Sequence, residues 1–161
     1  MKLRIHRGAE QIGGCCVELE AKGQRLVLDL GLPLDAADED DLAALLPHVA
    51  GFRTPDPSLQ GIVLSHLHHD HIGLVPHLAT PPPVAIGADA RRIVDRAAPY
   101  LPSGAVLPDG PDLKDGIELQ FGPFTVTPVL MDHSAFDAYA LLVEADGHRL
   151  FYSGDVRGHG R

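Results

Sequence analysis

The sequence predicts an α/β (α+β) fold in which sheet packs against helices, within one domain that covers residues 1–161. Three observations predict it. Apolar and polar residues alternate with strand period near both ends of the chain, a continuous apolar run lies at Gly61-Ile62-Val63-Leu64, and three segments with a helical pattern lie between the ends. A chain of 161 residues is about one domain long and can bury a core.

The N-terminal part is predicted to form three strands. "LRIHR" (3–7) and "CCVELEA" (15–21) alternate apolar with polar residues, and "RLVLDL" (25–30) is an apolar strand whose end is marked by Asp29. The turn Lys22-Gly23-Gln24 separates the last two, and two strands around a glycine-bearing turn indicate a hairpin.

The middle of the chain alternates helical with extended patterns. In residues 35–50, acidic residues come before apolar residues that are spaced as on one face of a helix, which predicts a helix. The pattern does not define where this helix ends, because it contains Pro47. "GIVLS" (61–65) is typical of a central strand that is covered on both faces. A short helix is expected over 72–79, a strand over 83–88 and a second helix over 89–98, ending at Pro99.

The last part of the chain has strand period throughout. Its predicted strands are residues 117–121, 124–130, 138–145 and 148–154. Asp146-Gly147 between the last two is a strong hairpin signal.

Charge, hydropathy and cysteine usage restrict the function. The formal net charge of −9 argues against this segment being the main grip on a nucleic-acid backbone, although a metal ion or another domain can supply positive charge. No apolar run has the length of a membrane span or of a signal-peptide core, so we expect no membrane partner. Cys15 and Cys16 provide no disulfide framework, which fits a reducing cytoplasm.

The stretch "SHLHHDH" (65–71) carries four of the ten histidines directly after the apolar run. Crowded imidazoles repel one another when protonated and lose hydration when buried, and a divalent cation removes both costs because it binds the neutral ring. His66 and His68 are two residues apart and can face one side of an extended strand end, while Asp70 and His71 can aim at a neighbouring position. His69 is expected to point away. The loop can therefore serve two adjacent ions, and imidazole with carboxylate suits zinc.

The pattern HLHHDH after an apolar strand resembles the metallo-β-lactamase fold, whose members are mostly metal-dependent hydrolases. The resemblance runs through the chain: "RGAEQIGGCCVELEAKGQRLVLDLGL" is similar to the opening hairpin, "MDHSAFDAYA" to the third motif with His133, and "FYSGD" to the fourth with Asp155. It implies a metallo-β-lactamase-like αββα layer, of which this chain holds the N-terminal sheet-plus-helices half.

The resemblance also implies a two-metal site with Zn²⁺, or with Mn²⁺ as an alternative. One ion would be held by His66, His68 and His133, and the other by Asp70 and His71, with Asp155 bridging both.

Two further roles follow from the same likeness. Asp70 and Asp155 are the expected catalytic carboxylates, with proton handling by Asp70 as an addition to its ligand role. Asp29 is expected behind the ligands, where it would orient a histidine.

Within this fold the motifs "GAEQIGGCCVELEAKG", "LVLDLGL", "DHSAFDAYA" and "YSGDVRGHGR" resemble the β-CASP ribonucleases, including the ribonuclease J-like branch. That likeness implies hydrolysis of RNA phosphodiesters by a metal-activated water. The alternatives are hydrolysis of a thioester, lactone or β-lactam by a related site. The ligands do not separate these reactions, because ester and phosphodiester cleavage use the same activated water.

The chain departs from the family pattern after Asp155. A further ligand histidine, the second half of the fold and the inserted β-CASP domain do not occur before Arg161, and His159 lies too close to Asp155 to replace the missing ligand. We expect a piece of a longer enzyme. A short protein whose site is completed by another copy, as a homo-oligomer, and a half-domain that binds metal with little activity remain the alternatives.

Several side chains allow either a binding or a structural role. Arg91, Arg92 and Arg96 share a predicted helix and could contact phosphate, but a solvated helix face is the expectation. Tyr100 and Phe136 could stack on a base, but core packing is the expectation for both.

Overall fold

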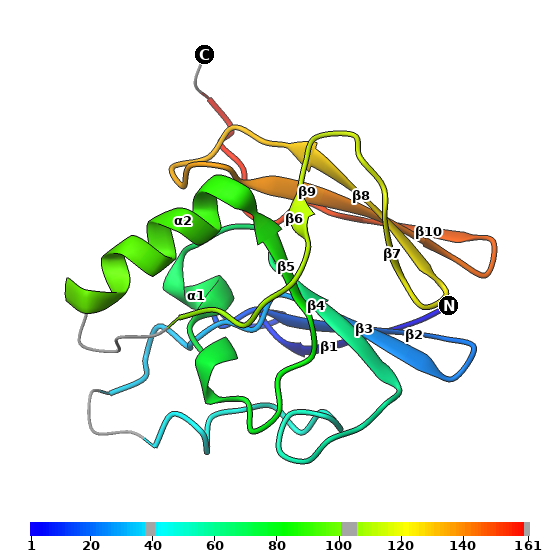
Figure 1. The fold of residues 1–161 in the computed structure, drawn as a ribbon, viewed down its shortest axis with the longest axis horizontal. Helices are drawn as coiled ribbons and strands as arrows, with labels where there is room; N and C mark the ends of the chain where they lie inside the picture. The colour runs from blue at the N-terminus through cyan, green and yellow to red at the C-terminus, as the bar shows by residue number, and fades with distance from the viewer. Residues whose placement is uncertain (38–40, 101–105, 160–161) are drawn as a thin grey trace.

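The computed structural model describes residues 1–37, 41–100 and 106–159, and their strands form two sheets (Figure 1). The larger sheet has the order β1-β2-β3-β4-β5-β6. Its strands are β1 (Lys2–Arg7), β2 (Cys16–Ala21), β3 (Gln24–Leu28), β4 (Leu59–Val63), β5 (Val84–Gly87) and β6 (Asp112–Leu113). The first three are antiparallel neighbours, whereas β3 to β6 run parallel.

The smaller sheet is antiparallel throughout and has the order β10-β9-β8-β7. Its strands are β7 (Leu119–Phe121), β8 (Phe124–Leu130), β9 (Tyr139–Ala145) and β10 (His148–Tyr152). The C-terminal strands predicted from the apolar alternation are thus all present, with shifted ends. The predicted α/β (α+β) class is confirmed.

Every second side chain along the strands points into the space between the two sheets, and these side chains form one core. Leu19 of β2 and Leu26 of β3 face Phe124, Leu141 and their neighbours on the smaller sheet. Gly61 on β4 leaves room for the Phe121 ring, because a Cβ at this position would lie 2.7 Å from two of its carbon atoms. The period-2 alternation of these strands therefore directs one set of side chains to the space between the sheets.

A second core lies on the other face of the larger sheet, under the helices. Val27 and Ile62 point to this side, whereas Leu26, Leu28 and Val63 point to the smaller sheet, so β3 and β4 are covered on both faces as the sequence predicted. The helical elements are α1 (His69–Ile72), the 3-10 helix η1 (Val75–His77), α2 (Ala88–Ala97) and the 3-10 helix η2 (Ala98–Tyr100). None of the helices in the described residues has the length and apolar character needed to cross a bilayer.

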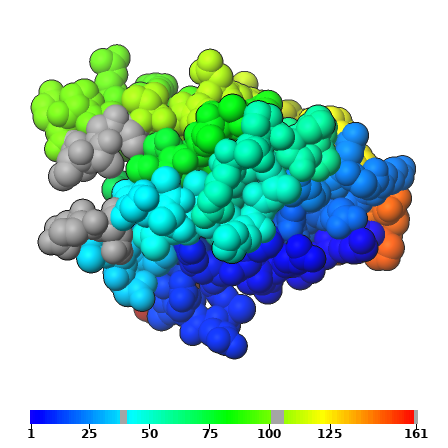
Figure 2. Space-filling view, turned by 90° about the horizontal axis from the view of Figure 1, so that it is seen from below, coloured from blue at the N-terminus to red at the C-terminus, as the bar shows by residue number. Residues whose placement is uncertain are grey.

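The helix predicted over residues 35–50 is wrong for the part that the structure describes; residues 38–40 lie outside it. Residues 42–45 form turns, with bonds from the Ala44 N–H to the Asp41 carbonyl and from the Leu45 N–H to the Leu42 carbonyl, three residues apart. Pro47 cannot donate, and its ring would clash with the carbonyl four residues earlier. Figure 2 shows this segment, in cyan, beside the blue N-terminal strands.

Two guanidinium groups from elsewhere in the chain bind the carbonyl oxygens that a helix would have used. Arg7 Nη2 donates to the Leu45 oxygen at 2.6 Å, and Arg53 Nη2 donates to the Leu46 oxygen at 2.7 Å. The apolar spacing was still informative, because Leu46 is buried in the core and Leu42 and Leu45 pack against it.

Smaller differences concern the ends of elements. The helix expected over 72–79 is divided into α1, which begins at His69, and η1, which contains Pro76. The helix expected over 89–98 is α2, shifted by one residue. Strand β6 was not predicted, because its two residues depend on pairing of Ile86 with Asp112 and of Gly87 with Leu113.

Candidate metal centre

The site lies where β3 and β4 end, and Asp29 is its anchor. Because β3 and β4 are parallel, their carboxyl ends meet at one edge of the sheet. Asp29 is fully buried, has a φ of 56°, and accepts four hydrogen bonds. Its Oδ1 accepts from the Ser65 N–H at 2.7 Å, and its Oδ2 accepts from the Ser65 hydroxyl at 2.8 Å. The other two donors are His71 Nδ1 and the Tyr152 hydroxyl, each at 2.7 Å from Oδ2.

Backbone hydrogen bonds fix the histidine-rich turn to the segment that follows β3. The Leu30 N–H donates to the His71 carbonyl at 2.8 Å, and the Leu32 N–H donates to the His69 carbonyl at 3.0 Å. Gly31 lies between them and packs so closely that a Cβ there would overlap the carbonyl oxygen of Asp70. A glycine is therefore required where the two backbone segments meet.

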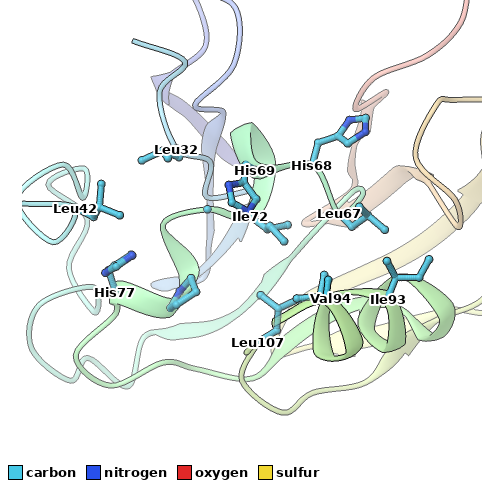
Figure 3. A pocket seen from close by; sticks show the side chains of 13 residues that line it. Leu32, Leu42, Leu67, His68, His69, Ile72, His77, Ile93, Val94 and Leu107 are labelled. Carbon is cyan, nitrogen blue, oxygen red and sulfur yellow. The ribbon is translucent and has the colours of Figure 1, made fainter. Parts of the chain in front are cut away.

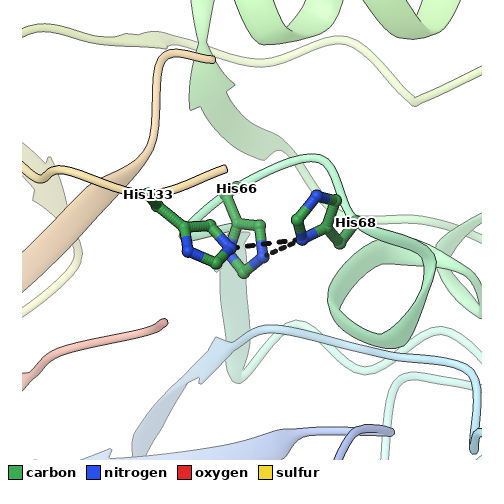
Figure 4. A group of neighbouring side chains, drawn as sticks. All are labelled: His66, His68 and His133. Atoms are coloured by element: carbon green, nitrogen blue, oxygen red, sulfur yellow. Dashed lines mark hydrogen bonds between the residues drawn. The ribbon is translucent and has the colours of Figure 1, made fainter. Parts of the chain in front are cut away.

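Three imidazole nitrogens converge beside this turn (Figure 4). His68 Nδ1 lies 3.0 Å from His66 Nε2 and 3.2 Å from His133 Nε2. One nitrogen lone pair cannot satisfy two approaching ring nitrogens well, whereas a cation among the three rings would accept a lone pair from each. His66, His68 and His133 therefore fit a metal ion, and their ligand atoms lie within 4.8 Å of one another.

A second group lies next to the first and shares His66 with it. Ligand atoms of His66, His71 and Asp155 also lie within 4.8 Å of one another. His71 Nε2 lies 3.4 Å from Asp155 Oδ1 and 3.6 Å from Asp70 Oδ2. The other oxygen of Asp155, Oδ2, lies 3.9 Å from His133 Nε2, so this carboxylate lies between the two groups.

The protonation of the rings follows from burial and from neighbouring charge. Burial, together with the charge of His71, lowers the pKa of His66 to about 3, so this ring is neutral at physiological pH. Burial likewise lowers the pKa of His133. Burial would also lower the pKa of His71, but the hydrogen bond to Asp29 and the nearby carboxylates outweigh it and raise the pKa. Neutral imidazoles are the form that binds a metal ion.

The structure brings the predicted site residues together. His66, His68, Asp70, His71, His133 and Asp155 surround one small region, with Asp29 behind His71. Their roles as ligands and catalytic groups stay predictions. One detail differs from the expectation, because His66 lies within reach of both groups rather than the first alone. His69 and His159 belong to neither group.

Tyr152 is the residue that sequence reasoning missed. It stands at the end of β10 in the smaller sheet and donates to Asp29 Oδ2, so it joins the two sheets directly behind the site. The sequence offered one signal, which is the strand period: Leu150 and Tyr152 are two residues apart, so both side chains point to the same face of β10. That face packs against the core between the sheets. Nothing local shows that the hydroxyl of an inward tyrosine meets an aspartate more than 100 residues earlier.

A cavity of about 290 Å³ adjoins the site on the side of α1, η1 and α2 (Figure 3). His68 and His69 line it together with mainly apolar side chains, among them Leu32, Leu67, Val94 and Leu107. Among the described residues that line it there is no carboxylate, lysine or arginine. The cavity therefore suits an uncharged group next to the candidate metal centre.

Two packed sheets, with histidine and aspartate side chains from both of them clustered at one edge, are the arrangement of the metallo-β-lactamase fold. Residues 37–159 match the family model "Beta-lactamase superfamily domain", and the chain belongs to this superfamily.

Curated relatives and solved structures agree with this assignment. The chain is 24% identical over 150 residues to ribonuclease J of Mycobacterium tuberculosis, covering 93% of this chain and 27% of that protein. It is 34% identical over 74 residues to an RNase J-like protein of Methanocaldococcus jannaschii, covering 46% of this chain and 15% of that protein. The chain thus spans about a quarter of the length of the first of these relatives.

Among solved structures, a protein of unknown function from Enterococcus faecalis superposes with a TM-score of 0.80 at 23% identity, over 98% of this chain and 44% of that one. A metallo-β-lactamase from Cronobacter sakazakii superposes with a TM-score of 0.61 at 22% identity, over 92% and 58%. At these identities the likeness shows the fold alone. The predicted resemblance to the metallo-β-lactamase fold and to the N-terminal part of ribonuclease J is confirmed.

Proposed function

We propose that this chain is the metal-binding part of a zinc-dependent hydrolase that cleaves RNA phosphodiesters, with Mn²⁺ as the alternative ion. The observation that carries the proposal is the convergence of His66, His68 and His133 on one point, with His71 and Asp155 beside them. Zinc ions bound there would activate a water, orient a phosphodiester and stabilise the leaving oxygen.

Residues of the chain itself would orient the ligands and accept a proton. Asp29 accepts from His71 Nδ1, which directs His71 Nε2 toward Asp70 and Asp155. The Asp70 side chain is 20% exposed and that of Asp155 is 48% exposed, so both carboxylates can be reached from solvent. We assign Asp70 Oδ2 as the acceptor of the proton that leaves the attacking water.

RNA as the substrate is supported by relatives that are named ribonuclease J and align over 93% of this chain. We further propose that residues 1–161 form one domain, since both sheets share one buried core. Within a longer protein or a homo-oligomer, other residues would complete the site. A cytoplasmic location stays part of the proposal, and the free thiols of Cys15 and Cys16 agree with it.

The first experiment measures zinc stoichiometry. The native chain is expected to bind two ions, and His133→Ala and Asp155→Asn are expected to bind fewer, because each removes a ligand atom from a group. His69→Ala is the matched control, since it removes an imidazole from the same turn without touching either group. Equal zinc content in native chain, His133→Ala and His69→Ala would refute the proposed metal centre.

A thioester, lactone or β-lactam hydrolase is the second candidate, and the cavity beside His68 favours it. Its apolar lining matches an acyl group better than a sugar-phosphate chain. Assays of zinc-loaded protein on single-stranded RNA and on an acyl thioester separate the two. Turnover of the thioester alone would replace the RNA proposal, and zinc binding with turnover of neither would indicate a metal-binding module.

A further inference from the structure

An exposed aromatic ring of the segment between β8 and β9 lines a hollow together with residues of α2. Phe136 is 65% exposed, so the expectation that it packs in the core is wrong; Tyr100 is 88% exposed and differs in the same way. Phe136 lines an open hollow of about 790 Å³ together with Ile93, which is 42% exposed, and with Arg92 and Arg96. Large apolar side chains exposed together in this way mark binding surfaces.

The position of Phe136 is fixed by its neighbour in the chain. Asp137 Oδ2 accepts from the Asp89 N–H at 2.9 Å and from the Ala90 N–H at 3.1 Å, which caps the first turn of α2. Asp137 Oδ1 accepts from the Tyr139 hydroxyl at 2.7 Å. Gly87 makes this approach possible, because a Cβ there would overlap the Asp137 carboxylate. The segment that carries His133 is thereby attached to α2.

The charges around the ring suit a phosphate. Arg92 Nη1 lies 2.8 Å from Asp89 Oδ1 in a highly exposed pair. Arg96 is exposed and makes no hydrogen bond or ion pair within the described residues. A guanidinium with no partner among the described residues thus lines the same hollow as an exposed aromatic ring. Proteins that hold single-stranded nucleic acid combine these two side chains.

The hollow adjoins the cavity at the histidines, because the two share lining residues on α2. Ile93 and Ala97 line both, and the cavity reaches His68. Phe136 also lies three residues after His133, whose ring belongs to the first ligand group. A chain lying along α2 would therefore lead to the metal centre.

We propose that the hollow formed by Phe136, Ile93 and Arg96 binds single-stranded RNA, with a base stacked on Phe136 and a phosphate at Arg96. This inference rests on the proposed function, because it takes RNA as the substrate. Paired bases offer no free face for stacking, so the surface selects single strands over duplexes.

The test measures binding of a short fluorescent single-stranded RNA to the 161-residue chain in EDTA, where no cleavage competes. Phe136→Ala is expected to raise the dissociation constant about 5- to 150-fold, from the usual effect of removing one stacked aromatic side chain. Phe136→Trp retains a stacking face and is expected to bind like the native chain. Arg96→Gln is expected to reduce the slope of log affinity against log salt by about 0.7.

The matched controls are Phe151→Ala and Arg149→Gln on β10, which remove an exposed phenyl ring and an exposed guanidinium from the smaller sheet. The proposal is overturned if Phe136→Ala binds as well as Phe151→Ala, if duplex RNA binds as tightly as single strands, or if the native chain binds no RNA. Binding that depends on Phe136 in a zinc-loaded protein that cleaves no RNA would support this surface and reject the proposed function. RNA cleavage by a protein whose RNA affinity is unchanged in Phe136→Ala would support the proposed function and reject this surface.

Discussion

Replacing Asp29 by asparagine tests whether the buried carboxylate organises the site. The two side chains have nearly the same shape, but asparagine has one oxygen and no charge. In the native chain Oδ2 accepts from Ser65, His71 and Tyr152, and Oδ1 accepts from the Ser65 N–H. Whichever way the amide is turned, its NH₂ group faces at least one donor.

The magnitude follows from this count of hydrogen bonds. One hydrogen bond to a charged acceptor contributes about 1.5–3 kcal/mol, and a buried donor without a partner costs about 1–3 kcal/mol. Because Asp29 is fully buried, water cannot replace the lost acceptor. We expect Asp29→Asn to lower the free energy of unfolding by about 3 kcal/mol. Zinc affinity should fall about 10- to 100-fold, since the charged carboxylate that orients His71 is replaced by a neutral amide with a single oxygen.

The assay is urea unfolding in EDTA, followed by zinc titration against a chromophoric chelator. Asp95→Asn on the exposed face of α2 is the control, because it changes the net charge equally without touching the network. Tyr152→Phe removes one of the four donors and is expected to cost about 1.5–3 kcal/mol. If Asp29→Asn and Asp95→Asn unfold at the same urea concentration and bind zinc equally, Asp29 does not organise the site.

Two further predictions concern stability. Gly31→Ala should lower the free energy of unfolding by more than about 3 kcal/mol, because the new Cβ overlaps the Asp70 carbonyl. Gly23→Ala is the control: it has open space around it and should cost only about 1 kcal/mol for its positive φ. Equal unfolding midpoints of the two variants would contradict this prediction. Burial raises the pKa of Glu18, but hydrogen bonds led by that from Arg25 outweigh it and hold the pKa below its ordinary 4.5. The carboxylate therefore stabilises the fold above pH 4.5, and the stability gap between native chain and Glu18→Gln should shrink as pH falls below that value; a gap independent of pH in urea titrations would refute it.

The candidate site could be predicted largely because its residues lie close together in sequence. His66, His68 and His71 fall within one turn after a buried strand, and such spacing brings side chains together in almost any fold that retains the strand. His133 and Asp155 were found only through resemblance to a family. Spacing alone carries no information about partners more than 60 residues away.

The helix predicted over residues 35–50 failed because contacts from outside the segment determine its structure. In residues 41–50 the apolar spacing is helical, yet Arg7 and Arg53 hold the carbonyl oxygens and Pro47 interrupts the pattern. Local propensity was overruled by side chains that the segment meets only after folding.

By itself, the sequence determined the strands other than β6, the α/β (α+β) class and the cluster of imidazoles after β4, since alternation, apolar runs and short-range spacing act within a few residues of chain. Only the tertiary structure decided that Tyr152 reaches Asp29, that Asp155 lies between the two ligand groups, and that Phe136 stands exposed beside Arg96. These contacts join segments far apart in the chain. They form only when two sheets pack face to face, which places groups together by geometry that no local pattern records.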